Sequence, residues 1–361
     1  MKVVIAGGGT AGHVNPAIAL GRALDDVSVT FIGTNKGAEA KLVPAAGFAL
    51  ETIEVRGFDR SRPLSIFGVG ATALRALKTA RRLLKQLAPD VVVGMGGYVA
   101  LPVVAAARLA RIPIVVHEQN SVFGLTNRIS KRWARRVAVS FEETLEDAGS
   151  NGVKTGNPVL PELANMDRER ERKSAIDRFD LDAGRKTLLV FGGSQGARRI
   201  NQAVPGLVSL WSDKSDRQIL HITGSSAAAQ TEEGESKGLL LYRKVDFVER
   251  MQEPYAVADL AVVRGGATTV AELGVVGLPA LVVPYPYHRD KQQERHGRAL
   301  ERAGAARVIA DEDTTPERIA SEADAILSDD GRLKAMALAA KSAGAPGAAD
   351  ALAHVVREAA A

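Results

Sequence analysis

His13 is the residue whose type and position most directly suggest chemistry. It follows Gly7-Gly8-Gly9 and Gly12, and a helical pattern begins after it at Pro16. Glycines let an anion approach the backbone, and the unpaired N–H groups of a helix N-terminus attract phosphate. The helix dipole disfavours a second positive charge, so the pKa of His13 should be lowered. The imidazole would then be neutral near pH 7, as a general base requires.

The stretch around His13 therefore predicts a phosphate cradle with a histidine base, and two alternatives stay open. One is a purely structural turn between a strand and a helix. The other is a dinucleotide site, because Gly7, Gly9 and Gly12 match the G-x-G-x-x-G pattern. The second expected strand ends at 31–34 without an acidic residue to hold a ribose hydroxyl, which weakens that alternative.

Four further polar clusters follow expected strands. Gly94 to Tyr98 forms a second glycine turn, which could hold a pyrophosphate beside the first or simply connect strand and helix. His117 to Asn120 places four polar side chains at a strand end, where they would line a cleft or form a surface loop. Gly193 to Ala197 adds a hydroxyl and an amide to an anion-friendly turn. Arg264 to Thr269 leads to Glu272, a carboxylate able to accept two sugar hydroxyls.

A last polar group, Asp290 with Gln292 and Gln293, follows the strand and turn at 283–286. Each of these groups alone is more often surface than site. Together they mark the carboxyl ends of many strands, which is where open α/β sheets bind ligands.

Short apolar runs that alternate with helical segments must position these residues. The expected strands are 3–5, 27–32, 91–94, 114–117, 137–139, 187–191, 219–223, 239–242, 260–263, 280–283 and 307–309. In the first half the helices are expected to start near Pro16, Lys36, Leu74, Pro102 and Leu125. This alternation is typical of a parallel sheet covered on both faces. Because the pattern restarts with a second strand–glycine–helix unit, the fold class is α/β, with two Rossmann-like domains facing across a cleft.

The domain boundaries follow from breaks in this pattern. Thr155-Gly156-Asn157-Pro158 interrupts it, and a charged helical stretch at 168–178 follows, most simply a solvated surface. We expect a first domain over 1–158, a second over 159–342, and a final segment over 343–361. The alanine-rich end reads as two helices interrupted at 344–347, and the last could pack back on the first domain.

Composition excludes several classes of function. The 361-residue chain has no cysteine, so disulfides, thiolate catalysis and cysteine metal sites are excluded. No segment approaches the roughly 20 apolar residues of a membrane span, and no signal peptide is expected. The chain is therefore expected in the cytoplasm. The net charge of +5 favours an anionic partner, whereas 4% aromatic residues without interleaved basic segments argue against nucleic acid.

Metal and serine-hydrolase chemistry also lack support. The six histidines stand far apart, and Asp311-Glu312-Asp313 is interpreted as a surface turn after the last strand. No G-x-S-x-G elbow is present. We expect no metal site and no cofactor.

The segment 63–87 could be a membrane-binding surface. Its helical pattern combines the apolar residues Ile66, Phe67, Val69, Leu74 and Leu77 with the basic residues Arg75, Lys78, Arg81, Arg82 and Lys85. A basic amphipathic helix can lie on an anionic bilayer. An ordinary helix with a solvated basic side is the alternative.

Taken together, the motifs resemble the MurG family of peptidoglycan GlcNAc transferases. The resemblance lies in GGGTAGHVNPA, VVGMGGYVALP, HEQNSVFGLTNR, TGNPV, VFGGSQGARRIN, DFVERM, VVRGGATTVAEL and VPYPYHRDKQQ, in the family's order and spacing from residue 3 to about 300. It implies a GT-B fold and an inverting transferase that moves GlcNAc from UDP-GlcNAc to the 4-hydroxyl of MurNAc in lipid I. The product would be lipid II, at the cytoplasmic face of the cell membrane, for cell-wall growth, cell shape and division.

The resemblance also implies roles for individual residues. His13 would be the catalytic base, and Glu118 could be a second catalytic or a structural residue. The acceptor diphosphate would contact Gly9, Gly96, Gly97 and Tyr98. The donor UDP-GlcNAc would contact Thr10, Gly12, Asn120, Ser194, Gln195, the Val248 backbone, Arg264, Gly266, Ala267, Thr268, Glu272, Gln292 and Gln293.

Three positions depart from the family's pattern. Leu160 replaces a frequent arginine after GNPV, Gly265 stands where serine or alanine is usual, and His296-Gly297 replaces a common Asn-Ala. These departures bear on the donor contacts more than on the class of enzyme. The rival functions are a non-hydrolysing UDP-GlcNAc epimerase, a glycosyltransferase with a soluble acceptor, and a nucleotide-sugar sensor without catalysis.

Overall fold

The computed structural model describes residues 1–55, 66–193, 196–224, 238–288 and 290–361. The chain forms two compact units, unit 1 with Met1–Leu160 and Ala345–Ala361, and unit 2 with Pro161–Gly344. Each unit is an open sheet of parallel strands with helices on its faces, as the alternating pattern predicts.

Unit 1 contains a seven-stranded sheet among the described residues, in the order β3-β2-β1-β4-β5-β6-β7. The strands are β1 Lys2–Ala6, β2 Ser28–Gly33, β3 Ala49–Thr52, β4 Val91–Gly94, β5 Ile114–Glu118, β6 Arg136–Val139 and β7 Gly152–Lys154. The helices are α1 Ala11–Ala23, α2 Glu39–Ala45, α3 Ile66–Leu87, α4 Gly97–Leu109, α5 Leu125–Ser130, α6 Leu145–Ala148 and α15 Ala348–Ala360.

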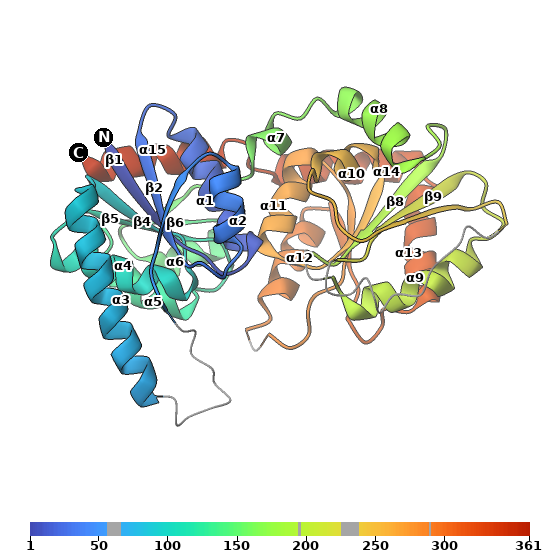
Figure 1. Cartoon of the computed structure of the whole chain (residues 1–361). Helices are drawn as coiled ribbons and strands as arrows, with labels where there is room; N and C mark the ends of the chain where they lie inside the picture. The colour runs from blue at the N-terminus through green and yellow to red at the C-terminus, as the bar shows by residue number, and fades with distance from the viewer. Residues whose placement is uncertain (56–65, 194–195, 225–237, 289) are drawn as a thin grey trace. The chain divides into compact units, whose positions relative to one another are not determined.

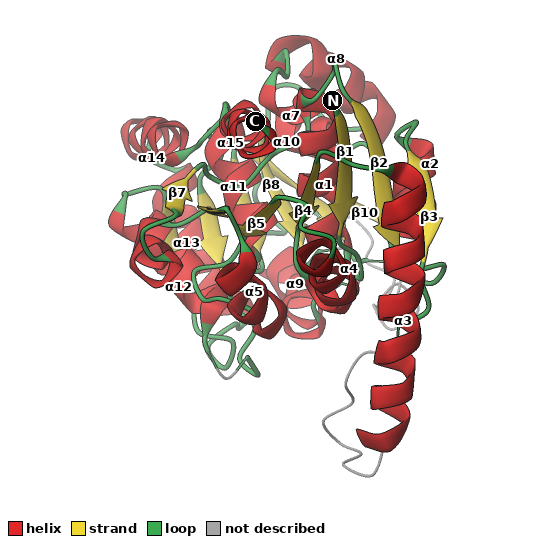
Figure 2. Cartoon of the chain, turned by 90° about the vertical axis from the view of Figure 1, so that its left-hand side faces the viewer, coloured by secondary structure: helices red, strands yellow, loops and turns green. Residues whose placement is uncertain are grey.

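The central strands of unit 1 are buried on both faces because each face carries its own apolar cluster. Val3 and Ile5 of β1 pack with residues of α1 and α15 on one face. Val4 and Ala6 pack with residues of α3 and α4 on the other (Figure 1; Figure 2). The last helix is anchored to α1 and to the sheet, and Arg357 pairs with Asp26 at 2.7 Å. This arrangement fixes the carboxyl ends of β1 and β4 rigidly beside one another.

Unit 2 repeats the arrangement with six described strands in the order β10-β9-β8-β11-β12-β13. The strands are β8 Lys186–Phe191, β9 Arg217–Ile222, β10 Leu241–Val245, β11 Leu260–Val263, β12 Ala280–Val282 and β13 Ala306–Val308. The helices are α7 Pro161–Ala164, α8 Arg168–Phe179, α9 Arg198–Leu210, α10 Gln252–Val257, α11 Ala267–Val276, α12 Gln292–Arg302, α13 Pro316–Leu327 and α14 Asp330–Ala343. Its core combines β8, β11 and β12 with α9 and α13.

The order of the strands reverses between β1 and β4 in unit 1 and between β8 and β11 in unit 2. Loops on either side of such a reversal run in opposite directions and leave a crevice at the carboxyl ends of the strands. The glycine turns after β1, β4, β8 and β11 all lie at these two reversals. Both sheets therefore carry their glycine turns at the edge where ligands bind.

Several predicted helix starts are wrong. Helix α1 begins at Ala11 and not at Pro16, because Thr10 has the extended backbone of an N-cap, with φ −106° and ψ 159°. Pro16 lies inside the helix, where its ring is buried. Helix α4 likewise begins at Gly97, five residues before Pro102. A proline fits the first turn of a helix well, but it did not mark the start of either helix.

Two strands were missed by the sequence prediction. Strands β3 and β7 form the two edges of the sheet in unit 1. An edge strand has one neighbour and is only partly covered, so its sequence need not be apolar. The ALET sequence of β3 and the three residues of β7 carry no such run.

Helix α3 begins at Ile66, eight residues before Leu74, and α2 begins at Glu39 rather than Lys36. The charged stretch at 168–178 is helical, and the two C-terminal helices are interrupted at 344–347 as predicted. No helix in the described parts of the chain combines the length and the apolar character needed to cross a membrane.

Candidate active site

The first glycine turn places His13 at the third residue of α1. The side chain of Thr10, the N-cap, lies with its Oγ1 3.3 Å from His13 Nδ1. His13 is partly exposed, not enclosed by apolar side chains. Burial lowers the pKa of His13, and the negative charge of Glu39 opposes this effect. The imidazole is therefore neutral near pH 7 as predicted, with burial as the largest cause.

The second glycine turn packs directly against the first. Gly97 has φ +75°, and a Cβ at this position would lie 2.5 Å from the carbonyl oxygen of Gly8. A Cβ on Gly96 would lie 3.4 Å from His13 Cδ2. Only glycine allows the two backbones to approach this closely. The N-termini of α1 and α4 thus lie side by side, with the His13 ring against the second turn and Tyr98 41% exposed beside it.

Glu39 is a buried carboxylate in this cluster that the sequence reasoning missed. Its Oε2 accepts a hydrogen bond from Gly9 N at 2.9 Å, and its Oε1 accepts from Thr34 N and Thr34 Oγ1 at 2.9 and 2.7 Å. The carbonyl of Gly9 accepts from Ala38 N at 3.0 Å, so both backbone polar groups of Gly9 already have protein partners. A single glutamate in the first turn of a helix is usually solvated, and the sequence held no signal that this one is buried.

The polar run 117–120 is not an exposed surface loop, because three of its four residues are buried. His117, Glu118 and Gln119 are 0%, 1% and 3% exposed. Glu118 Oε1 accepts from the backbone N and the Nδ2 of Asn120, both at 3.0 Å. Its Oε2 accepts from Gly124 N and Asn127 Nδ2 at the same distance. Both oxygens of this carboxylate are occupied, so Glu118 shapes the loop that follows β5.

His117 and Gln119, on either side of Glu118, also have hydrogen-bond partners within the protein. His117 Nε2 lies 3.1 Å from the Gly156 carbonyl, and Gln119 Nε2 donates to the Met95 carbonyl at 3.2 Å. Burial raises the pKa of Glu118, opposed by its hydrogen bonds, and burial lowers the pKa of His117 to about 4. Asn120 is half-buried, and its amide donates to Glu118. Through the bond from Gln119 to Met95, this run holds the second glycine turn in place.

In unit 2 the turn after β8 is only partly described. Gly193 and Gly196 have φ +89° and +78°, and α9 follows with Ala197 as its N-cap. Ser194 and Gln195 lie outside the described residues. Val248 follows β10, with its side chain 6% exposed.

The turn after β11 begins with an arginine that is already paired. Arg264 Nη1 lies 2.6 Å from Asp311 Oδ1, and it donates to the carbonyls of Val283 and Pro284 at 3.2 and 3.0 Å. Asp311 also lies 3.7 Å from Arg199, at the start of α9. The interpretation of 311–313 as a surface turn is wrong for Asp311, whose side chain is 11% exposed. The carboxylate neutralises much of the charge of Arg264.

Helix α11 begins directly after this turn, with Gly266 as its N-cap and Ala267 and Thr268 in its first turn. Glu272 lies one turn further along and is 9% exposed. Its Oε2 accepts a hydrogen bond from the hydroxyl of Tyr255, 2.8 Å away in α10. Burial raises the pKa of Glu272 to about 7, and the Tyr255 hydrogen bond opposes the rise. Tyr255, fully buried, is a second residue that the sequence reasoning missed.

Gln292 and Gln293 begin α12, where both are tied to the loop after β12. Gln292 Nε2 lies 2.8 Å from His288 Nδ1, and Gln293 Oε1 accepts from Tyr285 N at 3.0 Å. Tyr285 and Tyr287 meet edge to face with ring centroids 5.3 Å apart. The two glutamines therefore have defined positions at the edge of the Arg264 turn.

Gly265 and His296, two of the positions that depart from the family's pattern, contact each other. A Cβ on Gly265 would lie 2.3 Å from the carbonyl oxygen of Gln293, so only glycine fits there. The Gly265 carbonyl accepts a hydrogen bond from His296 Nδ1 at 2.9 Å. Burial lowers the pKa of His296 to about 4, so its ring is neutral. Leu160 is unconnected to this contact, since it packs partly buried on the core of unit 1.

The structure thus groups the predicted residues into two clusters. The His13 cluster of unit 1 contains Gly9, Thr10, Gly12, His13, Gly96, Gly97, Tyr98 and the buried Glu39, and Asn127 links Glu118 and Asn120 to it. The Arg264 cluster of unit 2 contains Arg264, Gly266, Ala267, Thr268, Glu272, Gln292 and Gln293. No group of three or more acidic or histidine side chains suited to a metal ion occurs among the residues that the structure describes.

Comparison with known proteins identifies the class of this site. The glycosyltransferase family 28 N-terminal domain matches residues 3–139, and the family 28 C-terminal domain matches residues 187–352. In solved structures, MurG of Acinetobacter baumannii has a TM-score of 0.76 and 28% identity, covering 99% of both chains. UDP-GlcNAc 2-epimerase of Neisseria meningitidis has a TM-score of 0.72 at 12% identity, covering 99% of this chain and 100% of that one, which shows a shared fold only.

Two curated relatives carry the name UDP-N-acetylglucosamine–N-acetylmuramyl-(pentapeptide) pyrophosphoryl-undecaprenol N-acetylglucosamine transferase. The protein of Desulfitobacterium hafniense (strain DSM 10664 / DCB-2) is 40% identical, over 99% of this chain and 98% of its own length. That of Listeria monocytogenes serotype 4a is also 40% identical, over 99% of both chains. The chain, with its two Rossmann-like units of the GT-B fold, therefore belongs to the MurG family of N-acetylglucosamine transferases within glycosyltransferase family 28.

Proposed function

We propose that this transferase moves GlcNAc from UDP-GlcNAc to the 4-hydroxyl of the MurNAc of lipid I by direct displacement, with His13 as the general base. The observation that carries this proposal is the position of His13, a neutral imidazole in the first turn of α1 and against the Gly96 turn. A base must lie about 3 Å from the hydroxyl proton that it removes. The imidazole stands among helix N-termini that would hold an anionic acceptor.

The reaction forms one bond and breaks one. The acceptor oxygen attacks the anomeric carbon of GlcNAc and gives its proton to His13, while the bond from that carbon to the UDP phosphate breaks and UDP leaves with the electron pair. A single displacement inverts the anomeric carbon. The growing negative charge on UDP must be stabilised by preorganised donors.

We assign this stabilisation to the helix N-termini and Arg264, without a metal ion or cofactor. Arg264 is paired with Asp311, so a large part of its charge is offset before UDP arrives. The helix dipoles at the starts of α9 and α11 would then carry a larger share. Ser194, Gln195 and Arg264 would contact UDP near its phosphates.

The remaining donor contacts follow from the Arg264 cluster. The Glu272 carboxylate would accept the ribose hydroxyls, the Val248 backbone would bind uracil, and Gln292 and Gln293 would face GlcNAc. Thr10, Gly12 and Asn120 would lie near the sugar and phosphates. For the acceptor diphosphate we assign the start of α4, with Gly96, Gly97 and Tyr98, because the N–H of Gly9 is already bonded to Glu39.

His296 offers a first test of the donor site. His296→Ala removes the hydrogen bond to Gly265, so the start of α12 should shift against the Arg264 turn. We expect the KM for UDP-GlcNAc to rise about fivefold, the effect of one neutral hydrogen bond of roughly 1 kcal/mol, with a smaller change in kcat.

The control for this variant is His296→Asn, because an asparagine Nδ2 can donate where His296 Nδ1 does. We expect the asparagine variant to have a KM close to that of the parent, whereas His296→Leu should behave like the alanine variant. Steady-state kinetics at varied UDP-GlcNAc measures this. Equal KM values in all three variants would show that the hydrogen bond of His296 does not affect donor binding.

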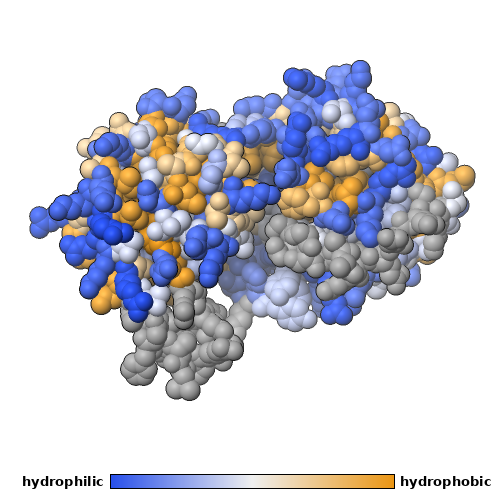
Figure 3. Space-filling view, in the orientation of Figure 1, coloured by the Kyte–Doolittle hydropathy of each residue, from blue (hydrophilic) through white to orange (hydrophobic). Residues whose placement is uncertain are grey.

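We also propose that unit 1 binds an anionic membrane surface at the cytoplasmic face as a peripheral protein. Arg75, Lys78, Arg81, Arg82 and Lys85 are all exposed on α3, whose first turns project beyond the sheet of unit 1 (Figure 2). Figure 3 shows hydrophilic side chains along the left-hand side of unit 1, where α3 lies. The side chains of Ile66, Phe67 and Val69 lie outside the described residues.

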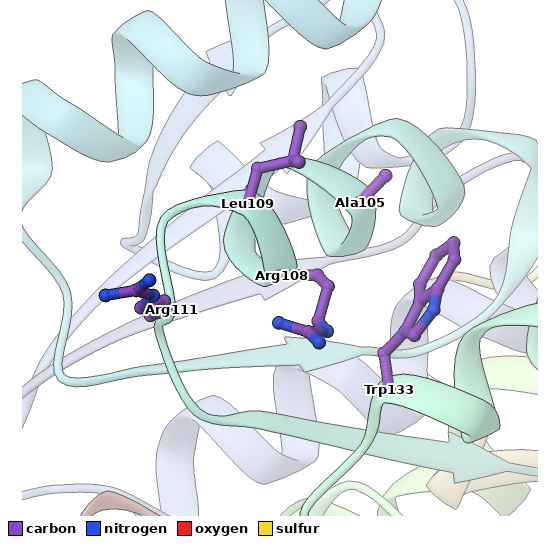
Figure 4. A pocket seen from close by; sticks show the side chains of 5 residues that line it. All are labelled: Ala105, Arg108, Leu109, Arg111 and Trp133. Carbon is purple, nitrogen blue, oxygen red and sulfur yellow. The ribbon is translucent and has the colours of Figure 1, made fainter.

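A cavity on α4, the helix that packs against α3, supports the same surface. It has a volume of about 500 Å³ and is lined by Ala105, Arg108, Leu109, Arg111 and Trp133 (Figure 4). Leu109 and Trp133 are 57% and 37% exposed, although both are large and apolar. Exposed apolar side chains with arginines beside them suit the interface of an anionic bilayer.

Charge reversal tests this surface. Arg81→Glu/Arg82→Glu should lower binding to vesicles that contain phosphatidylglycerol by at least about tenfold at low salt, since each basic residue near an anionic surface contributes roughly 1 kcal/mol. The matched control is Arg170→Glu/Lys173→Glu on exposed positions of α8, with the same change in charge. Equal sedimentation of both variants with the vesicles would contradict the assignment of α3.

The overall reaction is tested by UDP release from UDP-GlcNAc with and without a lipid I analogue. We expect release that depends on the analogue, with a disaccharide product. Formation of UDP-ManNAc from UDP-GlcNAc alone would favour an epimerase. Binding of UDP-GlcNAc without any UDP release would favour a sensor.

A further inference from the structure

Glu39 is a buried anion at the centre of the His13 cluster. It is 1% exposed, and its carboxylate accepts three hydrogen bonds, one from Gly9 N and two from Thr34. Burial raises the pKa of a carboxyl, but here the hydrogen bonds outweigh burial and hold the pKa of Glu39 below its usual value. An ionised carboxylate is stable inside a protein only when donors surround it in this way.

Three glycines shape the space for this carboxylate. A Cβ on Gly8, Gly33 or Gly37 would lie 2.3, 2.6 or 2.1 Å from an atom of the Glu39 side chain. These glycines belong to three separate segments: the turn after β1, the end of β2 and the loop before α2. Helices α1 and α2 pack against each other (Figure 1). The fold therefore closes three backbone segments around one negative charge.

A short path connects Glu39 to His13. Glu39 holds Gly9 by its N–H, and the next residue, Thr10, is the N-cap of α1. The Thr10 hydroxyl lies 3.3 Å from His13 Nδ1, where it can accept the Nδ1 proton and leave Nε2 as the basic nitrogen. The negative charge of Glu39 also acts on the imidazole through space, in the direction that favours its protonated form.

We propose that Glu39 is a positioning residue of the transfer reaction, which orients His13 through the Gly9–Thr10 turn and serves as its fixed countercharge. This inference rests on the proposed role of His13 as the base. When the acceptor hydroxyl forms its bond to the anomeric carbon, its proton moves to His13 and creates an imidazolium. Glu39 stays ionised, stabilises that positive charge and never takes the proton itself. His13 then loses its proton to solvent after UDP has left.

Other titratable groups around His13 do not serve this purpose. Glu118, from β5, accepts hydrogen bonds from four donors, one of them the Asn127 amide, so both of its oxygens are occupied. His117 is fully buried, and its Nε2 faces the Gly156 carbonyl. Tyr98, from α4, is exposed beside the second turn and bears a hydroxyl, not a carboxylate. Glu39 is therefore the negative charge that acts on the imidazole.

The test separates the charge of Glu39 from its shape. Glu39→Gln keeps the volume and removes the charge, and Glu39→Asp keeps the charge and shortens the side chain. We expect Glu39→Gln to lower kcat about tenfold or more, as loss of a preorganised electrostatic contact does. The acid limb of its kcat–pH profile should move to lower pH, because the imidazole loses the charge that favours its protonation.

We expect Glu39→Asp to lower kcat with its acid limb unchanged, since the charge remains while the turn is less firmly held. Neither variant should change UDP-GlcNAc affinity much. The matched control is Glu51→Gln, an exposed acid on β3, which should behave like the parent in every assay. Thermal unfolding shows whether each variant is folded, and the NMR titration of the His13 imidazole follows its protonation directly.

The outcomes are distinguishable from those for His13. If His13→Ala is inactive while folded Glu39→Gln keeps the parent's kcat and acid limb, the role of Glu39 is overturned and that of His13 stands. If His13→Ala is active, the proposed base is wrong. If Glu39→Gln does not fold, Glu39→Asp decides, and a kcat equal to the parent's would overturn the positioning role.

Discussion

His13→Ala should lower kcat by about 10²–10⁴-fold, the range that a positioned general base contributes. The affinity for UDP-GlcNAc should change little, because His13 lies in unit 1 and the ribose and uracil contacts are assigned to unit 2. The imidazole lies in the first turn of α1, against Gly96, and thermal unfolding of the variant shows whether the loss of activity has a structural cause. Single-turnover kinetics with a lipid I analogue measures the rate, and calorimetry with UDP measures the affinity.

The matched control for this variant is His354→Ala. His354 lies on α15 with its side chain 74% exposed, so its removal deletes a histidine without touching the His13 cluster. The parent profile supplies a second check: because burial lowers the pKa of His13, activity should stay high to a pH below the ordinary pKa of histidine and fall only beneath it. Turnover within a few-fold of the parent in His13→Ala would exclude the imidazole as base.

Glu272→Ala should weaken UDP binding by about 30-fold or more. Two hydrogen bonds from ribose hydroxyls to a carboxylate would be lost, and hydrogen bonds to charged groups contribute roughly 1.5–3 kcal/mol each. The pKa of Glu272 is raised to about 7 by burial, so the carboxyl is partly protonated at neutral pH. Since the ionised form accepts hydroxyl protons better, UDP affinity should rise between pH 6 and pH 8. Calorimetry across this range measures both effects.

As the pH rises, the free energy of unfolding should fall while the affinity for UDP increases. A carboxyl whose pKa is raised in the folded state binds its proton more tightly there than in the unfolded chain, so its ionisation destabilises the fold as the pH rises from about 4.5 to about 7. Glu272→Gln, which cannot ionise, should therefore unfold at a higher temperature than the parent at pH 8 while it binds UDP more weakly. A Glu272→Gln variant with lower stability and unchanged UDP affinity would remove Glu272 from the donor site.

Tyr255 and an exposed acid supply the controls for Glu272. Tyr255→Phe removes the hydrogen bond that holds the Glu272 pKa down, so the midpoint of the affinity–pH curve should move to higher pH. Glu317→Gln, at an exposed position of α13, should leave the curve unchanged. An identical midpoint in the parent and Tyr255→Phe would show that another group governs the pH dependence.

The two missed residues show where sequence reasoning stops. Glu39 and Tyr255 lie 26 residues and 17 residues from His13 and Glu272 in the chain, and each is fully or almost fully buried. Their importance comes from a single contact in space: Glu39 with the Gly9 N–H, and Tyr255 with the Glu272 carboxylate. Neither contact is between residues close in the sequence, so the local pattern that found the other site residues could not find them.

The polar run 117–120 shows a second limit of sequence reasoning, because the sequence left open whether Glu118 has a catalytic or a structural role. Four polar residues at a strand end suggest contact with a ligand, but Glu118 instead satisfies backbone and amide donors within its own loop. A carboxylate that binds a ligand and one that holds a loop have the same identity and the same place in the sequence. The partners of its two oxygens distinguish them, and those partners depend on how the chain after β5 folds back.

The amino-acid sequence by itself determined the class of fold, the glycine turns and the family, because these depend on local features: apolar runs of strand length, glycine where only glycine fits, and motifs at fixed spacing. The burial of Glu39 and Glu272 and the pairing of Arg264 with Asp311 were decided by tertiary structure alone. Burial, hydrogen-bond partners and pKa values arise when distant segments pack together, and no local pattern contains that information.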